Sequence, residues 1–181
     1  MKGVYKMDKA QFTFELIDKY TPETVIRNSL KQITEATQGY VIGNIEEYSG
    51  PIYSYNKPGG LSTALSVLKT SSETIKVDIQ EELGEQNNEN HRYEVFLTAK
   101  GLEHYRYRMM FVDYGAISYP VTIVMDEKLA IEYSGKRMTA FPINSMKELE
   151  DMLDRVINSD TMIFLIQKLI DEALRQESTE T

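Results

Sequence analysis

The stretch that decides the fold is residues 75–99, IKVDIQEELGEQNNENHRYEVFLTA. On each side of the polar loop at residues 84–90, apolar side chains occupy alternate positions. They are Ile75, Val77, Ile79 and Leu83 before the loop and Tyr93, Val95, Leu97 and Ala99 after it. Two alternating runs joined by a short polar loop predict a β-hairpin. Because alternation places apolar side chains on one face only, it predicts an antiparallel sheet with one packed face and one solvent-exposed face.

Outward from this hairpin, other short runs have strand-like patterns. They are residues 11–17, 40–48, 104–112, 118–125 and 129–133. A tight turn at residues 126–128 is expected to join the last two of these. Residues 121–124 are more continuously apolar than the other runs, which indicates a strand in the interior of the sheet.

Three helices are expected from their end signals, and a short one at residues 61–68 from its apolar spacing. Thr21 followed by Pro22 marks the start of the first, and Gly39 its end. Ser145 with Glu148 forms a capping box before the next, and Ser159 can cap a last helix that runs to about Arg175.

The predicted fold is therefore α+β. An antiparallel sheet of about six or seven strands has helices packed on one face, and two helices close the chain. We expect a single domain over residues 1–176, followed by a flexible tail at residues 177–181.

Composition excludes several classes of protein. The 181-residue chain has no cysteine, which rules out disulfides, thiolate catalysis and cysteine-ligated zinc. Its two histidines lie in no metal-binding motif, so neither a metal nor another cofactor is expected. No apolar run reaches the length of a signal peptide or a membrane span, and we expect a cytoplasmic protein that does not bind membranes.

The formal net charge of −8 argues against general nucleic-acid binding. Two segments carry the excess of acid. Residues 71–90 hold 1 basic and 6 acidic side chains, and residues 141–181 hold 4 and 9. Each segment is either a solvated acidic face or an acidic docking surface for a protein partner.

The most distinctive run of side chains is His104-Tyr105-Arg106-Tyr107-Arg108. On a regular strand, His104, Arg106 and Arg108 share one face, and the two tyrosines share the other. Two arginines spaced in this way suit a carboxylate, a phosphate or an acidic partner chain, with the tyrosines available for stacking.

Two further expectations belong to this strand. Its alternation predicts that Met110 and Val112 continue the arginine face as an apolar surface. A purely structural role for the arginines is the alternative, in which they pair with acids on neighbouring strands such as Glu94 or Glu132.

Tyrosine is abundant, with 12 residues against 6 phenylalanines and no tryptophan. Tyr48, Tyr53 and Tyr55 lie in or beside a connection rich in proline and glycine at residues 50–60. Tyrosines in such loops either make an interface or fold under the loop itself, and the sequence leaves both open.

No catalytic motif is found. Gly-x-Ser-x-Gly is absent, and the adjacent carboxylate pairs do not converge by spacing. The sequence favours a non-enzymatic intracellular protein-interaction domain of the inhibitor, immunity or counter-defence type, which acts through its acidic and tyrosine-rich surfaces. The alternative is a sensor or enzyme that binds a small anionic ligand through Arg106 and Arg108. A homodimer is compatible with either function.

Overall fold

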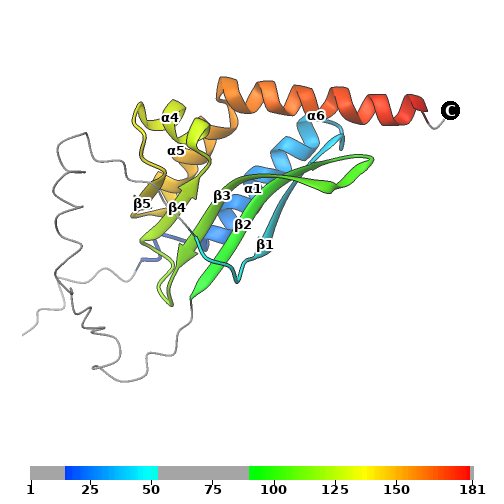
Figure 1. The fold of residues 1–181 in the computed structure, drawn as a ribbon. Coiled ribbons are helices and arrows are strands. Elements are labelled where there is room, and N and C mark those ends of the chain that lie inside the picture. The colour runs from blue at the N-terminus through cyan, green and yellow to red at the C-terminus, as the bar shows by residue number, and fades with distance from the viewer. Residues whose placement is uncertain (1–14, 53–89, 180–181) are drawn as a thin grey trace, which may run out of the picture.

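The computed structural model describes residues 15–52 and 90–179, and within these ranges the fold is α+β (Figure 1). Five strands and four helices follow one another along the described chain. They are α1 (Pro22–Ala36), β1 (Val41–Glu47), β2 (His91–Ala99), β3 (Leu102–Tyr114), β4 (Val121–Met125), α4 (Glu127–Ser134), β5 (Ala140–Ile143), α5 (Met146–Ile157) and α6 (Asp160–Thr179). The predicted strand at residues 75–83 and the predicted helix at residues 61–68 lie outside the described residues. The predicted hairpin between residues 75–83 and 93–99 is nevertheless wrong, because β2 is paired with β1 along one edge and with β3 along the other.

The sheet is an antiparallel meander. Its five described strands lie in the order β1-β2-β3-β4-β5, the same order as in the sequence. The predicted strands at residues 40–48, 93–99, 104–112 and 118–125 are confirmed as β1, β2, β3 and β4. The apolar strand β4 lies inside the sheet, between β3 and β5, as its composition indicated.

The first helix begins as its end signals predicted. The Thr21 side chain accepts a hydrogen bond from the backbone N–H of Thr24 (3.4 Å), and Pro22 follows it. Gly43 on β1 explains how closely this helix packs, because a Cβ atom there would lie 2.7 Å from the Cβ of Leu30. Glycine therefore lets α1 pack directly against the edge strand.

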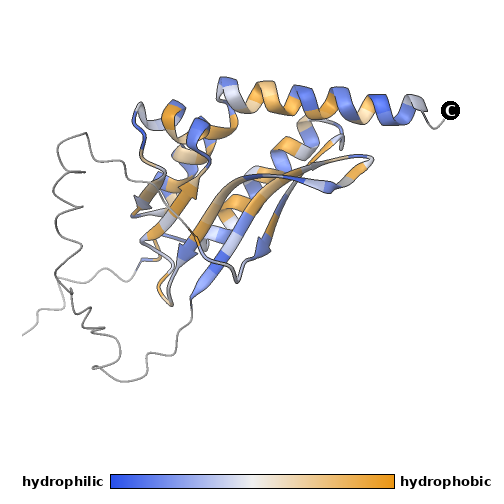
Figure 2. Cartoon of the chain, in the orientation of Figure 1, coloured by the Kyte–Doolittle hydropathy of each residue, from blue (hydrophilic) through white to orange (hydrophobic). Residues whose placement is uncertain are grey.

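The four described helices share one core with a single face of the sheet. In the view of Figure 1, α1 lies behind the strands and α6 runs along their upper end. Buried residues of all four helices join one cluster with strand residues such as Val95, Leu97, Met110, Val112 and Ile123. Figure 2 shows apolar and polar residues mixed along the strands, which fits a sheet with one packed face. None of the helices in the described ranges is long and apolar enough to cross a membrane.

Residues 129–133 form a helix, so the predicted strand there is wrong. Asp126, which was assigned to a turn, is the N-cap of α4 and accepts a hydrogen bond from the N–H of Lys128 (2.9 Å). Leu129 and Ala130 are buried together, as adjacent residues on a helix can be. The cap and the burial outweigh the short alternating pattern. The strand that was missed is β5, a four-residue edge strand that contains Pro142, a residue typical of edges.

The described part of the predicted strand at residues 11–17 is also wrong. Glu15–Ile17 are not in a strand, and Leu16 and Ile17 are 73% and 69% exposed. The carboxylate of Asp18 accepts a hydrogen bond from the N–H of Met146 (2.8 Å). This segment is therefore tied to the start of α5 and does not pair with the sheet.

The two C-terminal helices are confirmed, with differences at their ends. Ser145 Oγ accepts from the N–H of Glu148 (3.2 Å), and the Glu148 carboxylate accepts from the N–H of Asn144 (2.8 Å). The helix α6 continues past Arg175 to Thr179.

The start of α6 has a second cap that the sequence did not indicate. Glu132 of α4 accepts from the N–H groups of Asp160 (2.7 Å) and Thr161 (3.1 Å). The hydrogen bonds from Thr161 lower the pKa of the Glu132 carboxyl. This carboxylate therefore joins two helices and does not pair with a strand arginine.

Candidate functional site

The sheet face opposite the helices carries the two predicted arginines, Arg106 and Arg108, and we call it the uncovered face. No helix in the described ranges packs its buried side against it. Strand pairing and side-chain contacts place one set of residues there. They are Ile42, Glu46, Arg92, Glu94, Phe96, Arg106, Arg108, Phe111, Asp113 and Val124.

Glu94 lies at the centre of this face and is only 8% exposed. Its Oε1 accepts from Nη1 of Arg106 (3.2 Å), and its Oε2 accepts from Nε of Arg108 (2.8 Å). Arg106 also donates to Glu46 on β1 (2.9 Å). The cross-strand pairing expected with Glu94 is confirmed, whereas the pairing considered with Glu132 is wrong.

Aromatic rings pack against the guanidinium groups of the same two arginines. The guanidinium carbon of Arg106 lies 4.4 Å from the ring centroid of Phe96. That of Arg108 lies 4.9 Å from Phe111 and 5.5 Å from Tyr48. Each arginine side chain still keeps nearly half of its surface exposed, 48% for Arg106 and 47% for Arg108. Ion pairs and cation–π contacts therefore fix the guanidinium groups without burying them.

The charges on this face cancel. A further pair, Arg92 with Asp113 (3.6 Å), lies beside the cluster around Glu94. The ion pairs of the described face thus contain three arginines and three carboxylates. The net charge of −8 is not located here, and each of these guanidinium groups already has a carboxylate partner.

A β-bulge in β3 determines which residues follow the arginines. Phe96 pairs with Arg108, whereas the preceding Val95 pairs with Met110, so Met109 is an extra residue in β3. One extra residue reverses the alternation beyond it.

As a result, Met110 and Val112 face the helices and are buried in the core. The prediction that they continue the arginine face is wrong. Phe111, paired with Glu94, and Asp113, paired with Arg92, take their place.

The bulge also borders a hollow of about 260 Å³ beside Arg108. Its walls include Met109, Phe111, Val124 and Met125, and the acids Asp126 and Glu127 also line it. The hollow is large enough for one or two apolar side chains of a bound chain. It is too small for most drug-sized ligands, whose sites occupy roughly 300–1,000 Å³.

The remaining predicted residues are distributed differently. His104 and Tyr105 are exposed further along β3, and Tyr107 pairs with Leu97 and packs against the core. Burial raises the pKa of Tyr107 to about 12. Tyr53 and Tyr55 lie outside the described residues.

Tyr48 is the predicted tyrosine that joins the arginines. Its ring packs 4.7 Å from that of Phe111, and its hydroxyl donates to the carbonyl of Pro51 (3.3 Å). Sequence reasoning did not single out Phe96 or Phe111. The alternation of residues 94–98 could have placed Phe96 beside Glu94, but Phe111 depends on the bulge.

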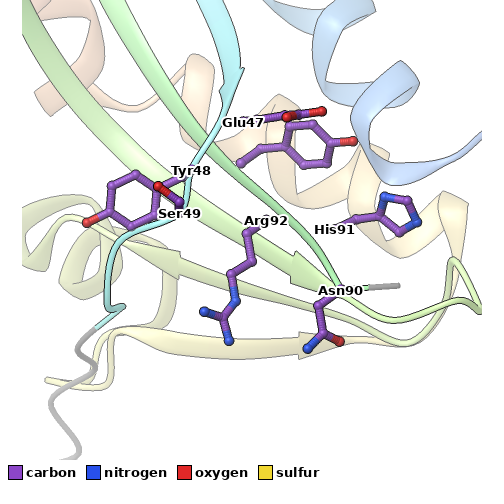
Figure 3. A pocket seen from close by; sticks show the side chains of 7 residues that line it. Glu47, Tyr48, Ser49, Asn90, His91 and Arg92 are labelled. Atoms are coloured by element: carbon purple, nitrogen blue, oxygen red, sulfur yellow. The ribbon is translucent and has the colours of Figure 1, made fainter. Parts of the chain in front are cut away.

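A second hollow, of about 560 Å³, lies where β1 ends and β2 begins (Figure 3). Among the described residues, those that line it are Glu47, Tyr48, Ser49, Asn90, His91, Arg92 and Tyr93. Figure 3 shows His91 and Arg92 pointing in different directions, as expected for neighbours on a strand. His91 stacks on Tyr114, with ring centroids 4.8 Å apart.

The groups around this second hollow are poorly suited to proton abstraction. Burial holds the pKa of the Tyr93 hydroxyl far above its usual range, so this group stays protonated and donates hydrogen bonds. The nearby Glu23 is bound to Arg27 (2.7 Å), which lowers the pKa of the Glu23 carboxyl. In the described ranges, no three histidine, aspartate or glutamate side chains gather where they could hold a metal ion.

Comparison of the chain with protein-family models, with curated proteins and with solved structures gives no match.

Proposed function

We propose that this protein is a non-enzymatic protein-interaction domain that binds its partner through the uncovered face of the sheet. The observation that carries the proposal is the pair Arg106 and Arg108. Both are half-exposed, and both are held in place by Glu94 and by aromatic rings. The proposed compartment is the cytoplasm, which suits a chain without cysteine.

The energetics of protein interfaces favour such a patch. Arginine and tyrosine are enriched among the residues that contribute most to binding, and here Tyr48 lies beside Arg108. Binding ordinarily costs about 0.5–1.5 kcal/mol for each flexible side chain that becomes ordered. Arginines that are already fixed avoid much of this cost. The hollow beside Arg108 supplies an apolar pocket into which a partner can insert a side chain.

A small anionic ligand at Arg106 and Arg108 fits this arrangement less well. Such a ligand has to share these guanidinium groups with Glu46 and Glu94, which already accept hydrogen bonds from them. The neutral ion-pair network provides little net attraction for a free anion. A protein partner can contact the exposed halves of the arginines together with the neighbouring aromatic rings, so its binding does not depend on a net charge attraction.

A domain of this kind acts by occupying a surface of its partner, as inhibitors, immunity proteins and counter-defence proteins do. Fold alone does not select among these roles. The identity of the captured partner is therefore part of the test.

The test is quantitative capture of partners by the tagged chain after cross-linking in its native cells. The variant Arg106→Ala with Arg108→Ala should lose a partner that the wild type retains. Lys31→Ala with Lys147→Ala is the matched control, because it also removes two cations, both in exposed helical ion pairs. Circular dichroism checks that both variants remain folded.

Two results would contradict the proposal. One is capture of the same partners by the wild type and by the double-arginine variant. The other is a rise in melting temperature on adding inorganic phosphate or citrate that is present in the wild type and absent from the double-arginine variant. That second result would establish the small-anion site instead.

A further inference from the structure

The helix α6 is apolar over far more of its surface than the core uses. Residues 162–166 are five consecutive apolar residues, Met-Ile-Phe-Leu-Ile. Successive residues of an α-helix are about 100° apart, so five of them surround the helix completely. Met162 is fully buried, whereas Ile163 is 55% and Phe164 65% exposed. A run of exposed apolar residues on a solvated helix is unfavourable unless another surface covers it.

The exposed apolar residues continue as a stripe along the helix. Ile163, Ile170 and Leu174 are separated by seven and four residues, which places them in one line, and we call this line the α6 stripe. It spans about 16 Å at 1.5 Å per residue. Leu174 is 46% exposed and Ile170 is half-buried. The stripe lies beside the line of Met162, Leu169 and Ala173 that packs into the core. In Figure 2, apolar and polar residues alternate along the visible side of this helix.

The charges around the stripe indicate what kind of partner fits it. The helices α5 and α6 together contain 4 basic and 8 acidic side chains. A second copy of the same helix would bring acidic side chains mainly against acidic ones, because α6 contains 4 acidic and 2 basic side chains. Like charges in contact are unfavourable, so self-association through this stripe is disfavoured.

We infer that the α6 stripe binds an amphipathic helix of a partner protein, with an apolar face for the stripe and lysine or arginine residues beside it. An amphipathic helix laid against an apolar surface is a recurrent mode of recognition, and opposite charges at its rim provide specificity. The inference shares with the proposed function the idea that this domain binds proteins. It uses a different surface, so the two can fail separately.

The experiment uses two fluorescent synthetic helical peptides of 18 residues, one of leucine and lysine and one of leucine and glutamate, with the same apolar face. Fluorescence anisotropy with the full chain should show binding of the lysine peptide and none of the glutamate peptide. The variant Ile163→Ser with Leu174→Ser should weaken binding about tenfold or more, because it removes two apolar contacts. Leu16→Ser with Ile117→Ser, which also changes two exposed apolar residues, should keep wild-type affinity.

The inference is overturned if the lysine peptide binds equally to the wild type and to the stripe variant, or if the glutamate peptide binds as well. Light scattering supplies a further check. A dimer that the stripe variant abolishes would assign the surface to a second copy of this chain. The variant Arg106→Ala with Arg108→Ala should bind the lysine peptide as the wild type does, so failure of one proposal does not imply failure of the other.

Discussion

The two faces of the described sheet contain residues from the same strands but are stabilised by different forces. The face toward the helices carries Val95, Leu97 and Met110, each at most 1% exposed. The opposite face carries arginines that form ion pairs with carboxylates on neighbouring strands. The guanidinium group of Arg106 also packs on an aromatic ring. Burial of apolar surface stabilises the first, whereas paired charges organise the second. In the described ranges no helix packs on the second face, and each prediction below tests the difference between the two faces.

The largest loss of stability is expected from a substitution on the helix-covered face. Leu97→Ala should lower the free energy of unfolding by about 2–5 kcal/mol, because Leu97 is fully buried and its truncation leaves a cavity. Ile42→Ala on the uncovered face, where the side chain is 40% exposed, should cost no more than about 1 kcal/mol. Urea denaturation of both variants measures the difference. Equal losses would mean that the two faces are not distinct in the way described.

A smaller loss of stability is expected from a substitution at the centre of the uncovered face. Glu94→Gln should destabilise the fold by about 1–2 kcal/mol, since it removes the charge shared by Arg106 and Arg108, which are themselves half-exposed. Asp113→Asn breaks a longer pair with Arg92 and should cost less than about 0.5 kcal/mol.

Adding salt distinguishes the electrostatic contribution of Glu94 to stability from its packing contribution. In 1 M NaCl the loss caused by Glu94→Gln should shrink, because screening weakens the ion pairs that involve exposed guanidinium groups. A loss that does not change with salt would show that Glu94 acts through packing alone.

The last prediction concerns the pH dependence of stability and tests Tyr107, which packs on the helix-covered face. The pKa of Tyr107 is raised from about 10 to about 12 in the folded chain, mainly by burial. The folded state therefore keeps its proton more tightly than the unfolded state does. This contribution to stability is fully present below pH 10 and is lost as the pH rises toward 12.

Tyr107→Phe should accordingly make the urea midpoint fall less steeply between pH 10 and 12. Tyr20→Phe, which removes the hydroxyl of a tyrosine that is 52% exposed, serves as the control. An unchanged slope in the Tyr107 variant would contradict the assignment of this ring to the packed face.

Helices and strands that are marked by short sequence patterns could be predicted. The caps Thr21 and Ser145 begin α1 and α5, and alternation located the strands that became β1 to β4. Predictions failed where a short pattern was ambiguous. Residues 129–133 alternate like a strand, yet Asp126 caps a helix there. Residues 15–17 look like a strand, but they are exposed and tied to α5 through Asp18.

The candidate site was only partly predictable, for a similar reason. The two-residue spacing of Arg106 and Arg108 correctly places both on one face, and Glu94 was among the expected partners. The positions of Phe111 and Met110 depend on the single extra residue Met109, and no local pattern marks it. Tyr48 reaches the arginines only because β1, β2 and β3 lie side by side.

By itself, the sequence determined the α+β class, most of the strand positions and most of the helix starts, because caps and alternation are patterns of residues close in the chain. Tertiary structure alone decided that the arginines are already paired and that half of α6 is left uncovered. Those properties depend on which distant residues meet, and that depends on register, bulges and packing. The excess of acid, a bulk number in the sequence, is likewise absent from the neutral uncovered face and is found in part on α5 and α6.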